Sequence, residues 1–372
     1  MKKNAFFEVQ SDLTSAKIKI YEDYLEGYLP KLLMPFGRCI IIDLFCGSGK
    51  NGKHKGSPLV LLDKLKYILN STPLKGNKEI LIQILFNDQN TSNISKLEYE
   101  LNNYKYDRDV IKITLKEETY EDYIDTLVKK LENNQSPKFI FLDPFTYSNV
   151  RMNDLINLMN LPKTEVLLFL PIFHSYRFAS KEFKSEHKTR KFVEEFTIEG
   201  VNNYENIYDF TLSVKNRLKK DIGLKYVRPI LIEGGGSKNS LFLLTKHRAG
   251  MLLMNKVATK NTIDGNSVKV KEQNLLSLFD ESREEIESSF LSSYKKGLIE
   301  KLKLTPLTNK EIVDFTIEEG FLPKQAKKIL SELYNNKKIV VIDKKGELIN
   351  SKLQWNIAEK IKIHTSFKWS SY

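Results

Sequence analysis

A glycine-rich turn follows the first strongly apolar run of the chain. The run "RCIII" continues into "DLFCGSG", which places Asp43 directly before a turn that contains Gly47 and Gly49. Glycine lets a ligand approach the backbone closely because it has no Cβ, and a carboxylate can accept hydrogen bonds from amino or hydroxyl groups. Together with Phe45, these residues predict a pocket for a phosphorylated or adenosyl ligand.

The identity of that ligand depends on where the acidic residues lie. Gly47, Gly49 and Gly52 satisfy the G-x-G-x-x-G dinucleotide fingerprint. That fingerprint expects an acidic residue about 20 positions further on, whereas Asp63 follows Gly52 by 11 residues and Asp88 by 36. The acidic residue before the glycines favours S-adenosylmethionine (SAM), which has an amino group and no pyrophosphate. Asp88 could accept from the ribose hydroxyls or cap the next helix. There are two alternatives: the turn binds a nicotinamide or flavin cofactor, or it binds nothing.

A second motif, "FIFLDPFTY", lies about 100 residues later. Its Asp143-Pro144-Phe145 resembles the (Asn/Asp/Ser)-Pro-Pro-(Tyr/Phe/Trp) motif of amino-group methyltransferases. A planar amine must lose conjugation before it attacks the SAM methyl, so Asp143 and the Pro144 carbonyl would accept its hydrogens. Phe145 or Tyr147 would hold the base. The alternative is an Asp cap and a proline at a loop entrance.

The elements around these motifs predict the fold class. Short β-rich runs from residue 39 to 173 alternate with helical segments, which indicates an α/β protein with a parallel, doubly wound sheet. Its ligand crevice is expected outside the carboxyl ends of the strands, where both motifs lie. There His174 and Arg177 would contact substrate. An amphipathic helix is predicted over residues 14–33, capped by Thr14 or Ser15, and a helical insertion over 181–222. "YVRPILIEGGGSKNSLFLLTKH" predicts an antiparallel hairpin that closes the sheet.

The last part of the chain predicts a second domain, over residues 286–372, after a main domain over 1–285. Residues 290–372 hold sixteen Lys, no Arg and nine acidic residues, so they supply +7 of the net charge of +12. Helix, turn, helix and the hairpin "KKIVVIDKKGEL" are typical of a winged helix-turn-helix domain. The lysines expected to meet DNA or RNA phosphates are Lys324, Lys327, Lys328, Lys344 and Lys345. The alternative is a packing or dimerisation domain with a solvated lysine face.

Residues 14–258 resemble the three-Cys-motif partner (TcmP) proteins, which are SAM-methyltransferase-like. The resemblance rests on "TSAKIKIYEDYL", "IIDLFCGSG", "KGSPLVLL", "FIFLDPF", "EVLLFLPIFHSYRF" and "SLFLLTKHRAGMLLMNKV". It implies a Rossmann-like class I methyltransferase fold and a partner protein with a radical-SAM three-Cys motif, and the basic tail looks like the winged-helix extension of some members. "DPFTY" departs from amino-methyltransferases in lacking their second proline.

The cysteine count and the lack of long apolar runs exclude several classes of protein. The chain has two cysteines and neither a long apolar run nor an N-terminal apolar segment, so a cytoplasmic protein without disulfides or membrane spans is expected. No metal-ligand spacing is present. The sequence therefore predicts a SAM-dependent methyltransferase acting on an amine or another nucleophile of a nucleotide or nucleic acid. The alternative is a non-catalytic, nucleic-acid-binding partner of a radical-SAM protein.

Overall fold

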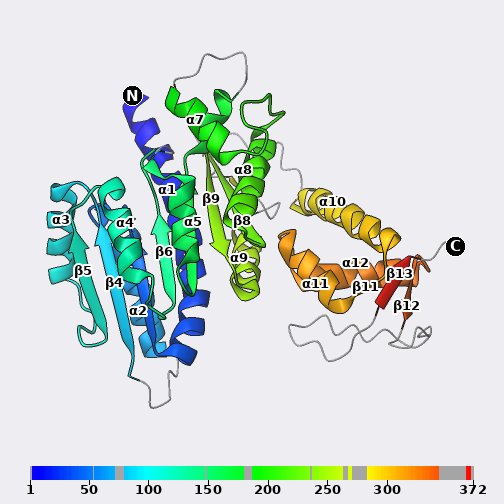
Figure 1. The fold of residues 1–372 in the computed structure, drawn as a ribbon, viewed down its shortest axis with the longest axis horizontal. Coiled ribbons are helices and arrows are strands. Elements are labelled where there is room, and N and C mark those ends of the chain that lie inside the picture. Colours follow the sequence, from blue (N-terminus) through cyan, green and yellow to red (C-terminus); the bar gives the residue numbers. More distant parts are fainter. Residues whose placement is uncertain are drawn as a thin grey trace. The chain divides into compact units, whose positions relative to one another are not determined.

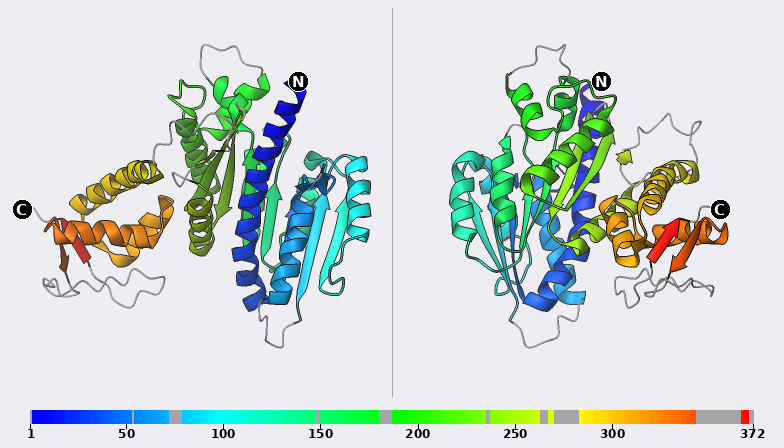
Figure 2. Two further views of the ribbon diagram at one scale, coloured as in Figure 1. Left: turned by 180° about the vertical axis from the view of Figure 1, so that it is seen from behind. Right: turned by 45° about the vertical axis from the view of Figure 1, so that its right-hand side comes forward.

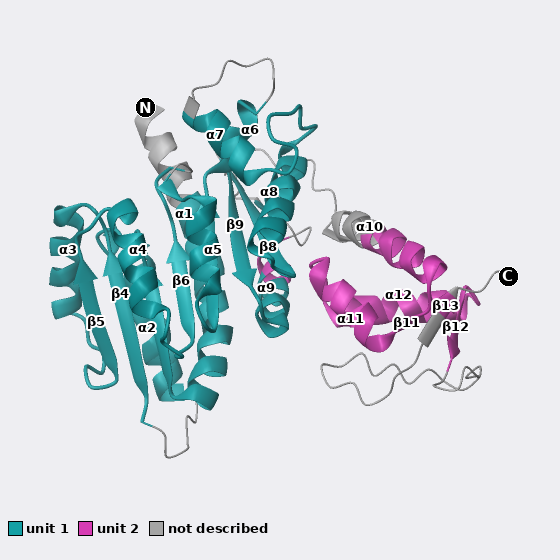
Figure 3. Cartoon of the chain, in the orientation of Figure 1, with its two compact units in different colours: residues 1–257, 267–273 teal, residues 258–266, 274–372 magenta. Residues whose placement is uncertain are grey.

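A computed structural model describes residues 2–52, 54–71, 79–146, 149–179, 187–234, 237–262, 267–269, 283–342 and 366–369. The chain divides into two compact units (Figure 3). Unit 1 comprises residues 1–257 and 267–273, and unit 2 comprises residues 258–266 and 274–372. The boundary expected from the sequence was at 285.

Unit 1 contains an eight-stranded sheet with the order β10-β8-β9-β7-β6-β1-β4-β5. Neighbouring strands pair in parallel, except that β9 is antiparallel to both β7 and β8. The strands are β1 Arg38–Asp43, β4 Leu81–Asn87, β5 Ile111–Lys116, β6 Lys138–Leu142, β7 Thr164–Leu170, β8 Tyr226–Gly234, β9 Ser237–Thr245 and β10 Ser267–Lys269. The chain winds outward from β1 in both directions, which confirms the predicted doubly wound α/β class. A small antiparallel pair, β2 Lys50–Asn51 and β3 His54–Lys55, follows β1.

Helices cover both faces of this sheet. On one face lie α4, α5 and α8 (Figure 1), which share a large apolar core with the inward side chains of the strands. On the other face lie α1 and α2 (Figure 2), which pack against each other. The helices of unit 1 are α1 Lys2–Phe36, α2 Ser57–Ser71, α3 Thr91–Asn102, α4 Tyr120–Leu131, α5 Met152–Asn160, α6 Ile172–Arg177, α7 His187–Phe196, α8 Ile207–Ile222 and α9 Arg248–Asn261, whose last turn belongs to unit 2.

Helix α1 is longer than the sequence suggested. It begins at Lys2, so the prediction that Thr14 or Ser15 caps its start was wrong. A stripe of tyrosines on α1 packs against aromatic side chains of the central strand β6: the ring centroids of Tyr21 and Phe141 lie 4.7 Å apart, and those of Tyr28 and Phe139 5.4 Å. This aromatic contact fixes α1 across the middle of the sheet.

Unit 2 has the element order of a winged helix-turn-helix domain. Its elements are α10 Arg283–Leu304, β11 Leu307–Thr308, α11 Asn309–Glu318, α12 Pro323–Asn335, β12 Ile339–Ile342 and β13 Ser366–Trp369. Thr308 and Glu311 form the predicted capping box at the start of α11. The three strands form an antiparallel sheet in the order β11-β13-β12. Strand β12 therefore pairs with β13, which begins at Ser366. The sequence had predicted a short hairpin within "KKIVVIDKKGEL", residues 337–348, so the strand that pairs with β12 lies further along the chain than expected.

Candidate functional site

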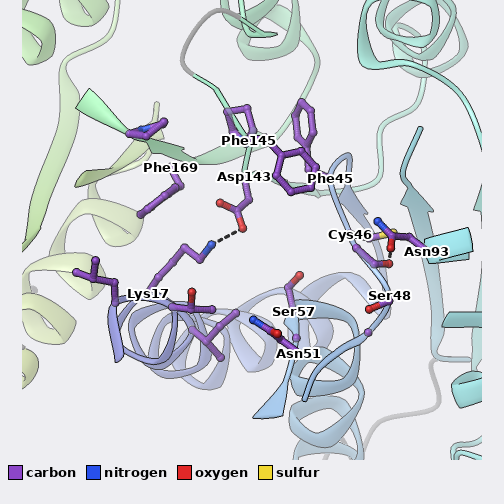
Figure 4. Close-up of a pocket in the computed structure, with 18 of the residues that line it drawn as sticks. Lys17, Phe45, Cys46, Ser48, Asn51, Ser57, Asn93, Asp143, Phe145 and Phe169 are labelled. Atoms are coloured by element: carbon purple, nitrogen blue, oxygen red, sulfur yellow. Dashed lines mark hydrogen bonds and ion pairs between the residues drawn. The ribbon is translucent and has the colours of Figure 1, made fainter. Parts of the chain in front are cut away.

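A cavity of about 620 Å³ lies at the carboxyl ends of β1, β6 and β7 (Figure 4). The glycine turn after β1 and the Asp-Pro-Phe segment after β6 both line it, so two motifs that are about 100 residues apart in sequence meet in space. Helix α1, strand β2, the first turns of α2 and α3 and the start of β9 complete the walls. The lining residues include Leu13, Thr14, Lys17, Ile18, Phe45, Cys46, Gly47, Ser48, Gly49, Ser57, Asn93, Asp143, Pro144, Phe145, Phe169, Pro171, Ser237 and Asn239.

The two glycines of the turn have different surroundings. Gly47 and Gly49 both adopt positive φ, +62° and +77°, where L side chains are strained. A Cβ added at Gly47 would meet no protein atom within 4 Å, whereas one added at Gly49 would lie 2.8 Å from Cδ1 of Leu97. Gly47 therefore presents bare backbone to open space, and Gly49 allows the turn to pack on α3.

Asp43 supports the turn from behind the cavity wall. It is 1% exposed, and it accepts hydrogen bonds from the Phe45 N–H at 3.2 Å and from the Ser57 hydroxyl at 2.6 Å. Burial raises the pKa of Asp43 to about 7, and the nearby Asp143 carboxylate adds to the rise. Because Ser57 lines the cavity, Asp43 acts on the site through that hydroxyl and through the shape of the turn.

Asp88 supports the turn in a similar way. It is 2% exposed and does not line the cavity. One carboxylate oxygen accepts from the Gly47 N–H at 3.0 Å, and the other accepts from the Asn90 N–H and from the Asn93 side chain. Asn90, and not Asp88, is the N-cap of α3, so the alternative that Asp88 caps the next helix was wrong, and the ribose contact stays a prediction.

The three residues of the Asp-Pro-Phe segment differ in how far they are exposed. Asp143 is partly exposed to the cavity, Pro144 is buried, and Phe145 is 68% exposed. Phe45 lies nearby in the cavity wall and stacks on Tyr120 with ring centroids 5.2 Å apart. The segment therefore offers a carboxylate and an exposed flat ring beside the glycine turn.

Lys17 lines the cavity and was not among the site residues predicted from the sequence. This α1 side chain is 8% exposed, and its ammonium group forms an ion pair with the Asp143 carboxylate and lies 4.5 Å from the centroid of Phe169 (Figure 4). A signal was present in the sequence, because Lys17 lies at helical spacing from Tyr21, a buried residue of α1. A charged residue on a buried stripe needs a partner.

Other residues predicted to contact substrate do not line this cavity. His174 and Arg177 are exposed residues of the short helix α6. The Arg177 guanidinium lies over the rings of Phe173 and Phe178, at 5.7 and 5.9 Å. Tyr147 lies outside the described residues. The expected substrate roles of these three residues stay predictions.

Three of the lysines that were predicted to contact nucleic acid lie on α12, the third helix of unit 2. Lys324, Lys327 and Lys328 are exposed on α12. No carboxylate of the described residues forms an ion pair with any of the three. The helix therefore presents a cationic surface. Lys344 and Lys345 lie outside the described residues.

The described ranges of the chain contain neither a candidate metal centre nor a candidate membrane-spanning helix. Within them, no group of three His, Cys, Asp or Glu side chains could hold a metal ion. Both cysteines are buried thiols without a disulfide. No helix in the part of the chain that the structure describes is long and apolar enough to cross a membrane.

Comparison with known proteins gives a family match for the C-terminal part. The family model of a GMT-like wHTH domain matches residues 264–346, which supports the winged helix-turn-helix assignment. No curated protein matches the chain.

Solved structures of low similarity were also found. Trm1 from Pyrococcus horikoshii, in complex with SAM, is 11% identical over 96% of this chain and 91% of its own, with a TM-score of 0.37. A SAM-dependent methyltransferase from Aquifex aeolicus is 12% identical over 59% of this chain and 91% of its own, with a TM-score of 0.27. A protein of Legionella pneumophila is 13% identical over 61% of this chain and 84% of its own, with a TM-score of 0.36.

The strand order of unit 1 defines its fold class. An antiparallel β9 inserted between β7 and β8 of an otherwise parallel sheet is the arrangement of class I methyltransferases. The chain therefore combines a class I methyltransferase fold with a winged helix-turn-helix domain.

Proposed function

We propose that this protein is a SAM-dependent methyltransferase that acts on an amine or another nucleophile of a nucleotide or nucleic acid. One observation carries the proposal: the bare backbone at Gly47 and the Asp143-Pro144-Phe145 segment line a single cavity at the carboxyl ends of the strands. This is the position at which doubly wound sheets bind ligands. The cavity volume of about 620 Å³ lies in the usual range of small-molecule sites.

Each wall of the cavity has a role in this proposal. The turn around Gly47, shaped by Asp43 and Asp88, would hold SAM, with Phe45 beside it. SAM supplies the electrophilic methyl group when it is bound. The acceptor amine would donate its hydrogens to Asp143 and to the Pro144 carbonyl, and its ring would lie on Phe145. The protein thus orients the nitrogen lone pair toward the methyl group and excludes water.

The ion pair of Lys17 with Asp143 supports this assignment of Asp143. The Lys17 ammonium is an N–H donor held against the carboxylate inside the cavity. An acceptor amine is also an N–H donor, although a neutral one, and it would take the place of Lys17 on the carboxylate when the substrate binds.

The same ion pair favours a second candidate function. A carboxylate already engaged by Lys17 suits a methyltransferase-like domain that binds ligands without catalysis. Such a protein would work through unit 2 on nucleic acid, as the partner of a radical-SAM protein with a three-Cys motif. The TcmP resemblance and the cationic surface of α12 support this alternative.

Methyl transfer from labelled SAM separates the two functions. The full chain is assayed against duplex DNA, structured RNA and free nucleotides, each with and without the candidate radical-SAM partner. Asp143→Ala should lower transfer by on the order of 100-fold or more while SAM affinity changes only a few-fold. Asp143→Asn keeps a carbonyl acceptor and should retain part of the activity. Transfer that is indifferent to Asp143→Ala refutes the role of Asp143, and SAM binding without any transfer contradicts the proposed methyl transfer and favours the binding function.

A further inference from the structure

A second cavity lies at the opposite end of the central strands from the first cavity. Its volume is about 370 Å³, and it is formed by the end of α1, the amino ends of β6 and β7, the end of β9 and the start of α9. Glu165 of β7 and Thr245 of β9 are directly paired in the sheet and both line it. The fold rule that places ligands at the carboxyl ends of parallel strands does not predict this cavity.

The walls of this cavity are mostly apolar, and the polar side chains among them are those of Glu165, Thr164, Thr245 and His247, besides the lysines of the rim. Tyr28, Leu32, Pro137 and Leu253 contribute to its walls. Glu165 is 6% exposed, and its two oxygens accept hydrogen bonds from the Tyr24 hydroxyl at 2.5 Å and the Thr245 hydroxyl at 2.6 Å.

Both carboxyl oxygens of Glu165 therefore already have hydrogen-bond donors within the protein. Burial raises the pKa of Glu165 to about 7, because the low-dielectric surroundings disfavour its charged form. A buried carboxyl group whose two oxygens both accept hydrogen bonds is compatible with an apolar ligand above it. The charged groups that could select a ligand lie elsewhere, on the rim.

The rim is cationic. Lys31, Lys163 and Lys246 are exposed and line the cavity. No carboxylate of the described residues forms an ion pair with Lys163 or Lys246. Lys163 has a φ of 51°, a left-handed conformation that glycine adopts without strain and that costs other residues free energy. Its ammonium lies 4.8 Å from the centroid of Phe36, a residue 41% exposed that also lines the cavity.

We infer that this cavity binds a small amphipathic anion, with an apolar body against Tyr28 and Leu253 and an anionic head group between Lys163 and Lys246. The volume and the apolar walls fit the usual dimensions of a small-molecule site, in which a few polar groups set orientation. Lys163 places a positive charge on the rim at a position where glycine would adopt the backbone conformation without strain. This inference uses no residue of the proposed methyl-transfer site and stands independently of it.

Two probes with the same number of carbon atoms and opposite charge test the charge preference. Decanoate and decylamine, each below its critical micelle concentration, are titrated into the full-length protein in a calorimeter. Decanoate should bind at least 10-fold more tightly than decylamine. Tighter binding of decylamine would mean that Glu165 selects a cation, and it would overturn the inference.

Substitutions locate the binding. Lys163→Gly combined with Lys246→Ala removes two rim charges, and the glycine also relieves the strain at position 163, so the fold should be retained. Decanoate affinity should fall at least 10-fold, whereas Lys188→Ala, a change at an exposed residue of α7, should leave it unchanged. Ala249→Phe fills the cavity from α9 and should weaken both probes, with retained cooperative thermal unfolding as the check on folding. Equal decanoate affinity in the rim variant, the filled variant and the original protein would exclude a site here.

Discussion

The ammonium group of Lys17 in α1 is paired with the carboxylate of Asp143 at the end of β6, across 126 positions of sequence. Both side chains are largely shielded, with 10% and 22% exposure. The Phe169 ring beneath the ammonium adds a cation–π contact. This pair joins the N-terminal helix to the chemistry-bearing segment of the cavity, and it makes α1 part of the site.

The stability effects of the two partners should not be additive. Lys17→Met keeps the length of the apolar stem but leaves the shielded Asp143 carboxylate without a cation. Asp143→Asn leaves the Lys17 ammonium without a carboxylate. Each single change should therefore lower the stability of the protein. The double variant removes both charges and should recover a coupling free energy of about 1–3 kcal/mol in denaturant unfolding. As a control, Lys66→Met changes an exposed lysine of the neighbouring helix α2 and should shift stability little. Additive effects of the two single changes would show that the pair contributes nothing to stability.

The two glycines of the turn should respond differently to alanine. Both substitutions place an L side chain at positive φ, at a cost of about 1–2 kcal/mol. Gly49→Ala also forces a Cβ to within 2.8 Å of Leu97, so it should destabilise the protein by about 1–3 kcal/mol more. Gly47→Ala should instead abolish SAM or S-adenosylhomocysteine binding, because its methyl group enters the open space of the cavity. Thermal unfolding and calorimetric titration measure the two effects, and unchanged SAM affinity in folded Gly47→Ala would place the ligand elsewhere.

Stability should decrease as the pH rises toward neutrality. Burial raises the folded-state pKa of both Asp43 and Glu165 to about 7, far above their values in an unfolded chain. Between about pH 4 and 7 the folded state therefore binds more protons than the unfolded state, so the stability contributed by these protons is lost as the pH passes through 7. Each group contributes a slope of up to about 1.4 kcal/mol per pH unit.

Glu165→Gln tests this pH dependence. Glutamine keeps an acceptor for Tyr24 and offers an N–H donor to Thr245, so the local geometry can be retained. The free energy of unfolding, measured by urea titration at pH 4.5 to 8, should depend less on pH in this variant. Glu132→Gln alters an exposed residue and should keep the original slope. An unchanged slope in Glu165→Gln would show that Glu165 does not titrate in this range.

The lysines of α12 should supply salt-dependent affinity for nucleic acid. Replacing Lys324, Lys327 and Lys328 by Gln should weaken binding of the full chain to duplex DNA. It should also reduce the slope of log affinity against log salt by about 0.9 for each DNA phosphate that the variant no longer neutralises.

A control of equal net charge replaces Lys112, Lys129 and Lys130 of unit 1, which are also exposed, by Gln. Fluorescence anisotropy over a range of salt concentrations measures both variants. An equal reduction of affinity in the two variants would mean that net charge alone drives binding, and α12 would have no specific role.

Local sequence patterns were sufficient for the fold class. The alternation of strands and helices, the hairpin that became β8 and β9, and the Thr308 capping box depend on periodicity and turn chemistry within a few residues, and each has its counterpart in the structure. The glycine turn and the Asp-Pro-Phe segment could be placed in one cavity because carboxyl ends of parallel strands share an edge of the sheet. Helix boundaries were less certain: no local signal distinguished Thr14 as a cap from Thr14 inside a helix that begins at Lys2.

The pairing of distant segments was decided by the tertiary structure. Lys17 meets Asp143 only because the tyrosine stripe of α1 packs across β6, and nothing near either residue in sequence specifies the other. Asp43 and Asp88 lie behind the cavity wall because the turn folds over them and uses their oxygens for its own N–H and hydroxyl groups. The cavity beside Glu165 likewise needs α1, β7, β9 and α9 together. Side-chain pairing and burial are set by packing among distant elements, and a single sequence carries no local record of that packing.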